Sequence, residues 1–271
     1  PLLYWSAQWL AARGVIRFLA EYEFDRYFRR SVLIMALLLA WPLFRWLNIT
    51  GWRELGLVPN PRPFRDAGGG FLISAVPLIA FAILLLILHM YSVRRFISPG
   101  DLANRTLSAA VVPFLEEPVF RGLLLGILLR RSAAPIAMFL TSSVFSILHF
   151  LKTSEQSTDV VTWVSGFDSI ANSFAQFREP MLVLAGFTTL FLVGWILAEA
   201  RIRTRSLWAP IGLHAGWIFA SAIFSKIARQ EVEALPWLGR NLLIGIAPLC
   251  VALISWGILR AWTRHVEITK S

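Results

Sequence analysis

The chain has 271 residues, of which 57% are hydrophobic and 15% are charged, and its formal net charge is +10. Soluble globular domains carry about 45–50% apolar and about 25% charged residues, so this chain has too little polar surface for a water-soluble body. The composition excludes a soluble enzyme and a disordered chain. It also excludes a disulfide-stabilised secreted module, because Cys250 is the single cysteine.

The positive charge does not point to nucleic acid. Of the 26 basic residues 23 are arginines, and they lie mainly at the ends of apolar stretches and in short connections. These are the positions at which basic side chains meet anionic lipid headgroups. Because no basic run is interleaved with stacking aromatic residues, we expect a lipid bilayer as a partner and no nucleic acid.

The N-terminal residues 1–30 alternate aromatic and charged side chains, which is typical of an interfacial amphipathic segment. Trp5, Trp9 and Arg13 interrupt the uniform apolar core that a signal peptide requires. Residues 31–271 are expected to form a single transmembrane bundle.

Seven apolar stretches of roughly 18–24 residues follow in that region, each long enough to cross a hydrocarbon core. The predicted spans are Ser31–Leu47, Phe71–Val93, Thr106–Leu129, Ser132–Leu151, Met181–Ala198, Ser206–Ser225 and Asn241–Leu259. Residues 152–180 form the longest polar connection. The predicted fold is therefore all-α, a polytopic bundle of about seven to eight helices with an intramembrane polar cavity.

The orientation of this bundle does not follow from the sequence. The predicted topology places 13 Lys and Arg on one side of the membrane and 12 on the other. The positive-inside rule does not separate numbers so close together.

Charged residues within the third predicted span carry the first functional signal. Glu116, Glu117 and Arg121 lie in an otherwise apolar stretch, where each ionisable group costs at least about 2.5 kcal/mol on insertion scales. Glu117 and Arg121 are spaced i,i+4 and can pair along one helix face. A structural Glu–Arg pair explains these two residues but leaves Glu116, which is rotated about 100° away, without a role.

Two histidines are expected near these carboxylates. At 1.5 Å per residue, Glu116 lies about 21 Å and His149 about 25 Å from the turn at Arg130, so a tight hairpin brings them to similar depth. His214 lies about 13 Å above the Arg201–Arg205 turn by the same measure. The spacing predicts that polar groups from three spans line one cavity.

The order of these motifs resembles the CPBP family, the CAAX prenyl protease and bacteriocin-processing (Abi) intramembrane endopeptidases. The matching motifs cover about residues 104–225 and read as follows: Glu116-Glu117-Pro118-Val119-Phe120-Arg121, Phe145-Ser146-Ile147-Leu148-His149 and His214-Ala215-Gly216-Trp217-Ile218. The resemblance implies an integral-membrane endopeptidase that hydrolyses a membrane-associated peptide or protein by glutamate-activated water.

The resemblance also implies a role for each site residue. Glu116 would be the general base, Glu117 and Arg121 would order the site, His149 would position Glu116 and the water, and His214 would stabilise the oxyanion. Family members commonly have Asn where this chain has Ile218, and an apolar residue cannot supply that second oxyanion donor.

Two alternatives remain open from the residues. In a zinc-dependent version of the same protease, Glu116, His149 and His214 would be the ligands, whereas the glutamate mechanism needs no cofactor. The second alternative is a catalytically weak homologue that acts as a membrane scaffold or immunity protein. Ile218, which stands where the family commonly has Asn, favours this alternative. The arginine-rich short connections suggest a bacterial inner-membrane protein; the sequence does not give its substrate or oligomeric state.

Overall fold

The structure is a computed structural model that describes residues 1–15, 60–150, 161–232, 236–239 and 241–268, with single positions between 24 and 45. These residues group into two compact units. Unit 1 comprises Pro1–Thr50 with Leu151–Glu179, and unit 2 comprises Gly51–Phe150 with Pro180–Ser271. The predicted division of the chain at residue 30 stays a prediction.

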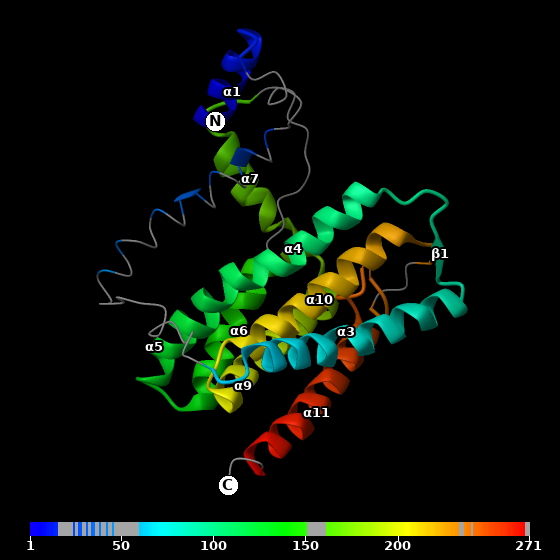
Figure 1. The fold of residues 1–271 in the computed structure, drawn as a ribbon. Coiled ribbons are helices and arrows are strands. Elements are labelled where there is room, and N and C mark those ends of the chain that lie inside the picture. Colours follow the sequence, from blue (N-terminus) through cyan, green and yellow to red (C-terminus); the bar gives the residue numbers. More distant parts are fainter. Residues whose placement is uncertain are drawn as a thin grey trace. The chain divides into compact units, whose positions relative to one another are not determined.

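Helices dominate both units, which confirms the all-α prediction (Figure 1). Unit 1 contains α1 (Leu2–Ala12), α7 (Ser165–Ser173) and the 3₁₀-helix η3 (Ala175–Arg178). In chain order, unit 2 contains α3 (Pro63–Ile87), β1 (Tyr91–Val93), α4 (Pro99–Glu117), the π-helix η2 (Pro118–Leu124), α5 (Leu125–Leu129), α6 (Ala134–Phe150), α8 (Pro180–Leu182), the π-helix η4 (Val183–Phe187), α9 (Thr188–Thr204), α10 (Trp208–Ile227), β2 (Ala228–Gln230) and α11 (Ile246–Ile268).

Three helical segments within the described residues are long and apolar enough to cross a membrane. They are Pro63–Ile87, Pro180–Thr204 and Ile246–Arg264, and Ala134–Phe150 is a shorter apolar helix. The predicted span Ser31–Leu47 lies largely outside the described residues. Charged residues lower the hydropathy of the third predicted span, but α4, η2 and α5 still follow one another from Pro99 to Leu129.

Helix α10 is the central helix of unit 2 and packs most closely on α3. Gly212 and Gly216 make this approach possible, because a Cβ atom at either position would overlap the α3 backbone at Ala67 or Phe71. Small residues spaced four apart allow two helix backbones to approach in this way. The close contact fixes the height and rotation of His214, which lies between the two glycines on α10.

A short antiparallel ribbon was not predicted. Phe71–Val93 was expected to be a single span, but α3 ends at Ile87 and His89 adopts a left-handed φ of 54°. Tyr91–Val93 then pairs as β1 with Ala228–Gln230. Hydropathy could not reveal this change, because a short apolar run reads alike as helix or strand until its partner is known.

Helix α4 begins earlier than predicted and changes its geometry at Pro118. The Ser98 Oγ accepts a hydrogen bond from the Asp101 N–H at 3.3 Å and caps the first turn. Pro118 has no N–H to donate, and the chain continues from it as a π-helix through Leu124. Glu117 is the last residue of α4 and Arg121 lies within the π-helix, so the irregularity falls within the predicted site.

The polar connection 152–180 also contains structure that was not predicted. Residues Ser165–Ser173 form helix α7, and Ala175–Arg178 form a single 3₁₀ turn. The stretch Ser-Gly-Phe-Asp-Ser-Ile-Ala-Asn-Ser is too short and too polar to register as a span, and both elements belong to unit 1.

Candidate active site

The five residues singled out from the sequence come together in unit 2, from the four elements α4, η2, α6 and α10. Glu116 and Glu117 end α4, and Arg121 follows in η2. His149 is the second-last residue of α6, and His214 lies in the first half of α10. The predicted meeting of three spans at one depth is therefore observed in the contacts described below.

Three of these side chains form a buried ion-pair cluster. Glu117 is 0% exposed, Arg121 is 1% exposed and His214 is 5% exposed. The Arg121 Nη1 donates to Glu117 Oε1 at 3.0 Å, and the His214 Nδ1 contacts the same oxygen at 2.8 Å. The Arg121 Nη2 donates to the Gly194 carbonyl of α9 at 3.2 Å. Because Arg121 neutralises it, Glu117 can remain ionised without access to water.

The other two side chains form an accessible pair. The Glu116 side chain is 30% exposed and that of His149 is 27% exposed. The His149 Nε2 lies 3.1 Å from Glu116 Oε2, and its Nδ1 lies 2.9 Å from the Phe145 carbonyl. A carbonyl only accepts, so Nδ1 carries a hydrogen, and the contact with the carboxylate requires one further proton on Nε2 or on Glu116. The pair is built to hold one proton between a carboxylate and an imidazole.

His214 is oriented by the buried carboxylate. Its Nδ1–H donates to Glu117, so in the neutral ring Nε2 carries a lone pair. This Nε2 lies 3.9 Å from Glu116 Oε2. A neutral His214 in this tautomer can accept a proton or hold a metal at Nε2, and it can donate there only after it has been protonated.

Phe145 joins both halves of the site, a role that the sequence did not reveal. Its ring stacks on His149 with 3.9 Å between centroids and meets His214 edge-on at 5.8 Å. The Arg121 guanidinium carbon lies 4.3 Å from its centroid, within cation–π range. Its carbonyl also fixes the His149 tautomer. The Phe-x-x-x-His spacing, which places Phe145 one helical turn before His149, was the available signal.

The donor set of the site fits a divalent cation. One ligand atom each from Glu116, His149 and His214 lies within 4.8 Å of the others. Both imidazoles donate Nδ1–H to a neighbouring oxygen and turn Nε2 toward Glu116. This is the second-shell arrangement usual for histidines that bind zinc.

Ile218 occupies the position where the resemblance implies Asn. It follows His214 by one turn of α10 and is partly buried. The neighbouring Trp217 is 2% exposed and belongs to the apolar core of unit 2. The side chain of Ile218 contributes no hydrogen-bond donor beside His214.

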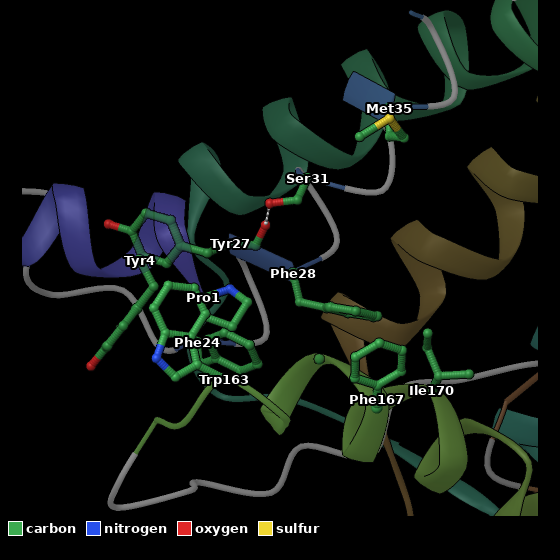
Figure 2. Close-up of a pocket in the computed structure, with 11 residues that line it drawn as sticks. Pro1, Tyr4, Phe24, Tyr27, Phe28, Ser31, Met35, Trp163, Phe167 and Ile170 are labelled. Atoms are coloured by element: carbon green, nitrogen blue, oxygen red, sulfur yellow. Dashed lines mark hydrogen bonds between the residues drawn. The ribbon is translucent and has the colours of Figure 1, made fainter. Parts of the chain in front are cut away.

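A second cavity lies within unit 1 and has a different character (Figure 2). Its volume is about 310 Å³ and its wall is aromatic, with Tyr4, Phe24, Tyr27, Trp163, Phe167 and Ile170 among the lining residues. The Ser31 Oγ, which lies beside it, donates to the Tyr27 carbonyl at 2.7 Å. No carboxylate or imidazole lines this pocket among the described residues.

Comparison with known proteins gives one match, over the segment that contains the site. A family model described as type II CAAX prenyl endopeptidase Rce1-like matches residues 98–220. The matched segment contains all five site residues and overlaps the predicted core of residues 104–225 from 104 to 220. No curated protein and no solved structure matches the chain.

Proposed function

The chain belongs to the CAAX prenyl endopeptidase family through residues 98–220, and we propose that it is a membrane-embedded endopeptidase in which Glu116 activates the attacking water. The observation that carries the proposal is the paired Glu116 and His149, accessible beside a buried and neutralised Glu117–Arg121 pair. Hydrolysis without a covalent intermediate needs such a base beside groups that stabilise the developing oxyanion.

In the proposed reaction, a water bound beside Glu116 gives a proton to its carboxylate while the oxygen attacks the peptide carbonyl. The tetrahedral intermediate then breaks the C–N bond, and Glu116 returns the proton to the leaving amine. His149 holds the Glu116 carboxylate through the 3.1 Å contact and keeps a proton available at Nε2. The two residues thus form one proton-transfer unit.

His214 has a conditional role in this scheme. Its Nδ1–H is engaged by Glu117, so it stabilises an oxyanion only as an imidazolium that donates from Nε2. Glu116 Oε2 lies 3.9 Å from Nε2, within reach of a proton held there. Glu117 and Arg121 act as positioning residues, because they fix the His214 ring and the end of α4 without touching the substrate.

Ile218 lowers the expected rate. Loss of one oxyanion donor costs about 2.7–4 kcal/mol of transition-state stabilisation in other hydrolases. With Ile218 in the family's Asn position, His214 carries this stabilisation with no side-chain donor beside it. A slow enzyme is expected, and a homologue that retains the site only as a scaffold or immunity protein would show no hydrolysis.

The proposed substrate is a peptide or protein that reaches the site from the membrane. Helices long enough to span a bilayer and the family match make this a membrane protein. The arginine-rich connections support a location in a bacterial inner membrane. Figure 1 shows the site-bearing helices α4 and α10 side by side in unit 2, whereas α6 packs on α9 and contacts η2.

Cleavage of a library of membrane-associated peptides in detergent tests the proposal. Glu116→Gln should abolish cleavage, because general-base catalysis contributes about 10²–10⁴-fold, and should leave the unfolding temperature nearly unchanged. Glu231→Gln is the matched control, since Glu231 lies in a surface turn after β2 and pairs with Arg229. Equal cleavage by the wild type and Glu116→Gln would refute the role of Glu116.

A zinc-dependent protease is the second candidate, favoured by the Nε2 atoms that both histidines turn toward Glu116. Glu116, His149 and His214 would hold the ion, which would supply a bound water with a lowered pKa. Metal analysis of the purified protein separates the candidates. About one zinc per chain, with activity lost on chelation and restored by zinc, supports this alternative; full activity without metal supports the glutamate mechanism.

A further inference from the structure

Basic residues of unit 2 collect at one of its two ends. The starts of α3 and α10 lie together, since Gly70 contacts the backbone of Ala209. The ends of α9 and α11 meet there through Glu199 and Arg260. Nine arginines lie at these termini and at the α5–α6 turn, and we call them the arginine end: Arg62, Arg65, Arg130, Arg131, Arg201, Arg203, Arg205, Arg260 and Arg264.

The α5–α6 turn belongs to the same end. Ala137 and Met138, in the first turns of α6, pack with Leu125 and with Ala198 of α9. Helices α6 and α9 therefore run antiparallel, with the turn that carries Arg130 and Arg131 beside the end of α9. By sequence position, three acidic residues share this end: Asp66, Glu199 and Glu267.

The opposite end carries less charge, and more of it is neutralised within the protein. We call it the ribbon end, because β1 and β2 form it. Its basic residues within the described part of unit 2 are Arg94, Arg95, Arg105, Lys226 and Arg229. Lys226 pairs with Asp101 at 2.9 Å, and Arg229 pairs with Glu231 at 3.0 Å. The Arg94 Nε donates to the Ala228 carbonyl.

Most charges at the arginine end remain available. Glu199 pairs with Arg203 at 2.6 Å and with Arg260 at 2.8 Å. For the other seven arginines, the described part of the chain contains no ion pair with a carboxylate. Arg62, Arg130 and Arg131 are exposed.

Three tryptophans also lie at or near the arginine end of unit 2. Trp208 begins α10, and Trp256 and Trp262 lie in the second half of α11. The Trp256 Nε1 donates to Glu199 Oε2 at 2.7 Å, and Arg260 lies over its ring at 4.2 Å. Tryptophan beside arginine is typical of the membrane–water interface, where the ring lies at the level of the headgroups.

From this asymmetry we infer that the arginine end of unit 2 lies at the cytoplasmic leaflet and binds anionic phospholipid headgroups. Among the described residues of unit 2, nine basic residues at the arginine end face five at the ribbon end, and the positive-inside rule uses Lys and Arg near the ends of membrane helices to assign the cytoplasmic side. The unpaired guanidinium groups complement the negative surface potential of that leaflet. The inference does not depend on the hydrolase activity.

Cysteine labelling in intact cells tests the orientation. In a Cys250→Ser background, Pro61→Cys places a thiol at the arginine end and Phe96→Cys places one at the ribbon end, where Phe96 is 81% exposed. A membrane-impermeant maleimide should label Phe96→Cys in intact cells and Pro61→Cys only after the membrane is opened. The reverse pattern would overturn the inference.

Matched double variants test whether the arginines cause this orientation. Arg130→Gln with Arg131→Gln should raise the fraction of inverted molecules at least several-fold. Arg95→Gln with Arg105→Gln removes the same charge from exposed ribbon-end positions and should leave the labelling pattern unchanged. Equal effects of the two double variants would contradict a directing role for the arginine end.

Reconstitution into nanodiscs tests the lipid partner. The unfolding temperature should be higher in discs of phosphatidylcholine with phosphatidylglycerol than in phosphatidylcholine alone. The Arg130→Gln, Arg131→Gln variant and 0.5 M salt should each reduce the difference, since salt screens exposed charges. An unfolding temperature that is the same in both discs, with wild-type protein at low salt, would exclude binding of anionic headgroups.

Discussion

Unit 2 contains two Glu–Arg pairs with the same i,i+4 spacing, and they differ in how completely the carboxylate is bound. Glu199 accepts from Arg203, from two nitrogens of Arg260 and from Trp256, so both of its oxygens are engaged. Glu117 accepts from Arg121 and His214 at Oε1 alone, and its Oε2 has no partner among the described residues.

The difference separates a structural ion pair from one that serves a site. The Glu199 cluster is saturated by donors and lies partly exposed, since Arg203 and Arg260 are 28% and 45% exposed. The Glu117–Arg121 pair is fully buried, and Glu117 also orients the His214 imidazole. It lies beside the partly exposed carboxylate of Glu116. A buried polar atom without a hydrogen-bond partner, such as Glu117 Oε2, costs stability and so calls for an explanation by function.

The largest expected effect is on activity, from the same substitution at the two carboxylates. Glu117→Gln leaves Arg121 without its countercharge and weakens the contact that orients His214, so kcat/KM should fall about 10²–10³-fold, as on loss of an oxyanion donor. Glu199→Gln should leave kcat/KM within about twofold, because the partners of Glu199 are Arg203, Trp256 and Arg260 and not residues of the site. Peptide cleavage by the two purified variants measures the contrast, and similar losses would remove the distinction.

Stability should show the second contrast. Arg121→Met leaves Glu117 buried without a countercharge, and breaking a buried pair costs about 3–5 kcal/mol of unfolding free energy. Arg203→Met removes one of three donor residues from Glu199, while Arg260 and Trp256 still bind both carboxylate oxygens. Because Arg203 is itself partly exposed, the loss should be about 0–1 kcal/mol. Denaturant unfolding in detergent measures both values. A smaller loss for Arg121→Met than for Arg203→Met would contradict the assignment.

Much of the fold could be predicted from the sequence because apolar length and charge placement fix the helices. The spans 132–151, 181–198 and 206–225 correspond to helices that begin or end within a few residues of the predicted bounds, apart from the continuation of α9 to Thr204. The ribbon at Tyr91–Val93 could not be predicted, since its partner strand lies 135 or more residues away in sequence. Helix α7 was missed because its residues are polar and few.

That the five candidate residues would lie together was predictable from the sequence, but the contacts among them were not. Ionisable residues in apolar helices are few, so the motifs alone selected all five. That His214 bonds Glu117 rather than Glu116 depends on the rotation of α10, which the glycine contacts with α3 set. The π-helix after Pro118 likewise shifts Arg121 in a way that 3.6-residue periodicity does not describe.

Phe145 provides a test of intermediate size, because it acts through the side chains that it contacts. Phe145→Leu keeps an apolar side chain but removes the stack on His149 and the cation–π contact with Arg121. The two contacts together are worth about 1–2 kcal/mol, so kcat should fall roughly tenfold.

Phe139→Leu is the matched control, since Phe139 pairs with Phe191 on an exposed face of the same helix and is 55% exposed. It should leave kcat unchanged. A positioning role for Phe145 further requires that the pH profile of kcat move with Phe145→Leu, because the substitution removes the ring stacked on the His149 imidazole while it keeps the backbone carbonyl. A loss of folded protein with an unaltered pH profile would indicate that Phe145 only packs the core.

Ile218→Asn gives the smallest expected effect and the only gain. The substitution places an amide donor one turn after His214, at a partly buried position of α10. Removal of a preorganised oxyanion donor costs about 10²–10³-fold, but a new donor is not aligned in advance, so kcat should rise only several-fold. The increase should disappear in the Glu116→Gln background, since an oxyanion forms only if water is activated. A fall in kcat on Ile218→Asn, with folding intact, would mean that Ile218 shapes the substrate pocket and that the oxyanion is stabilised elsewhere.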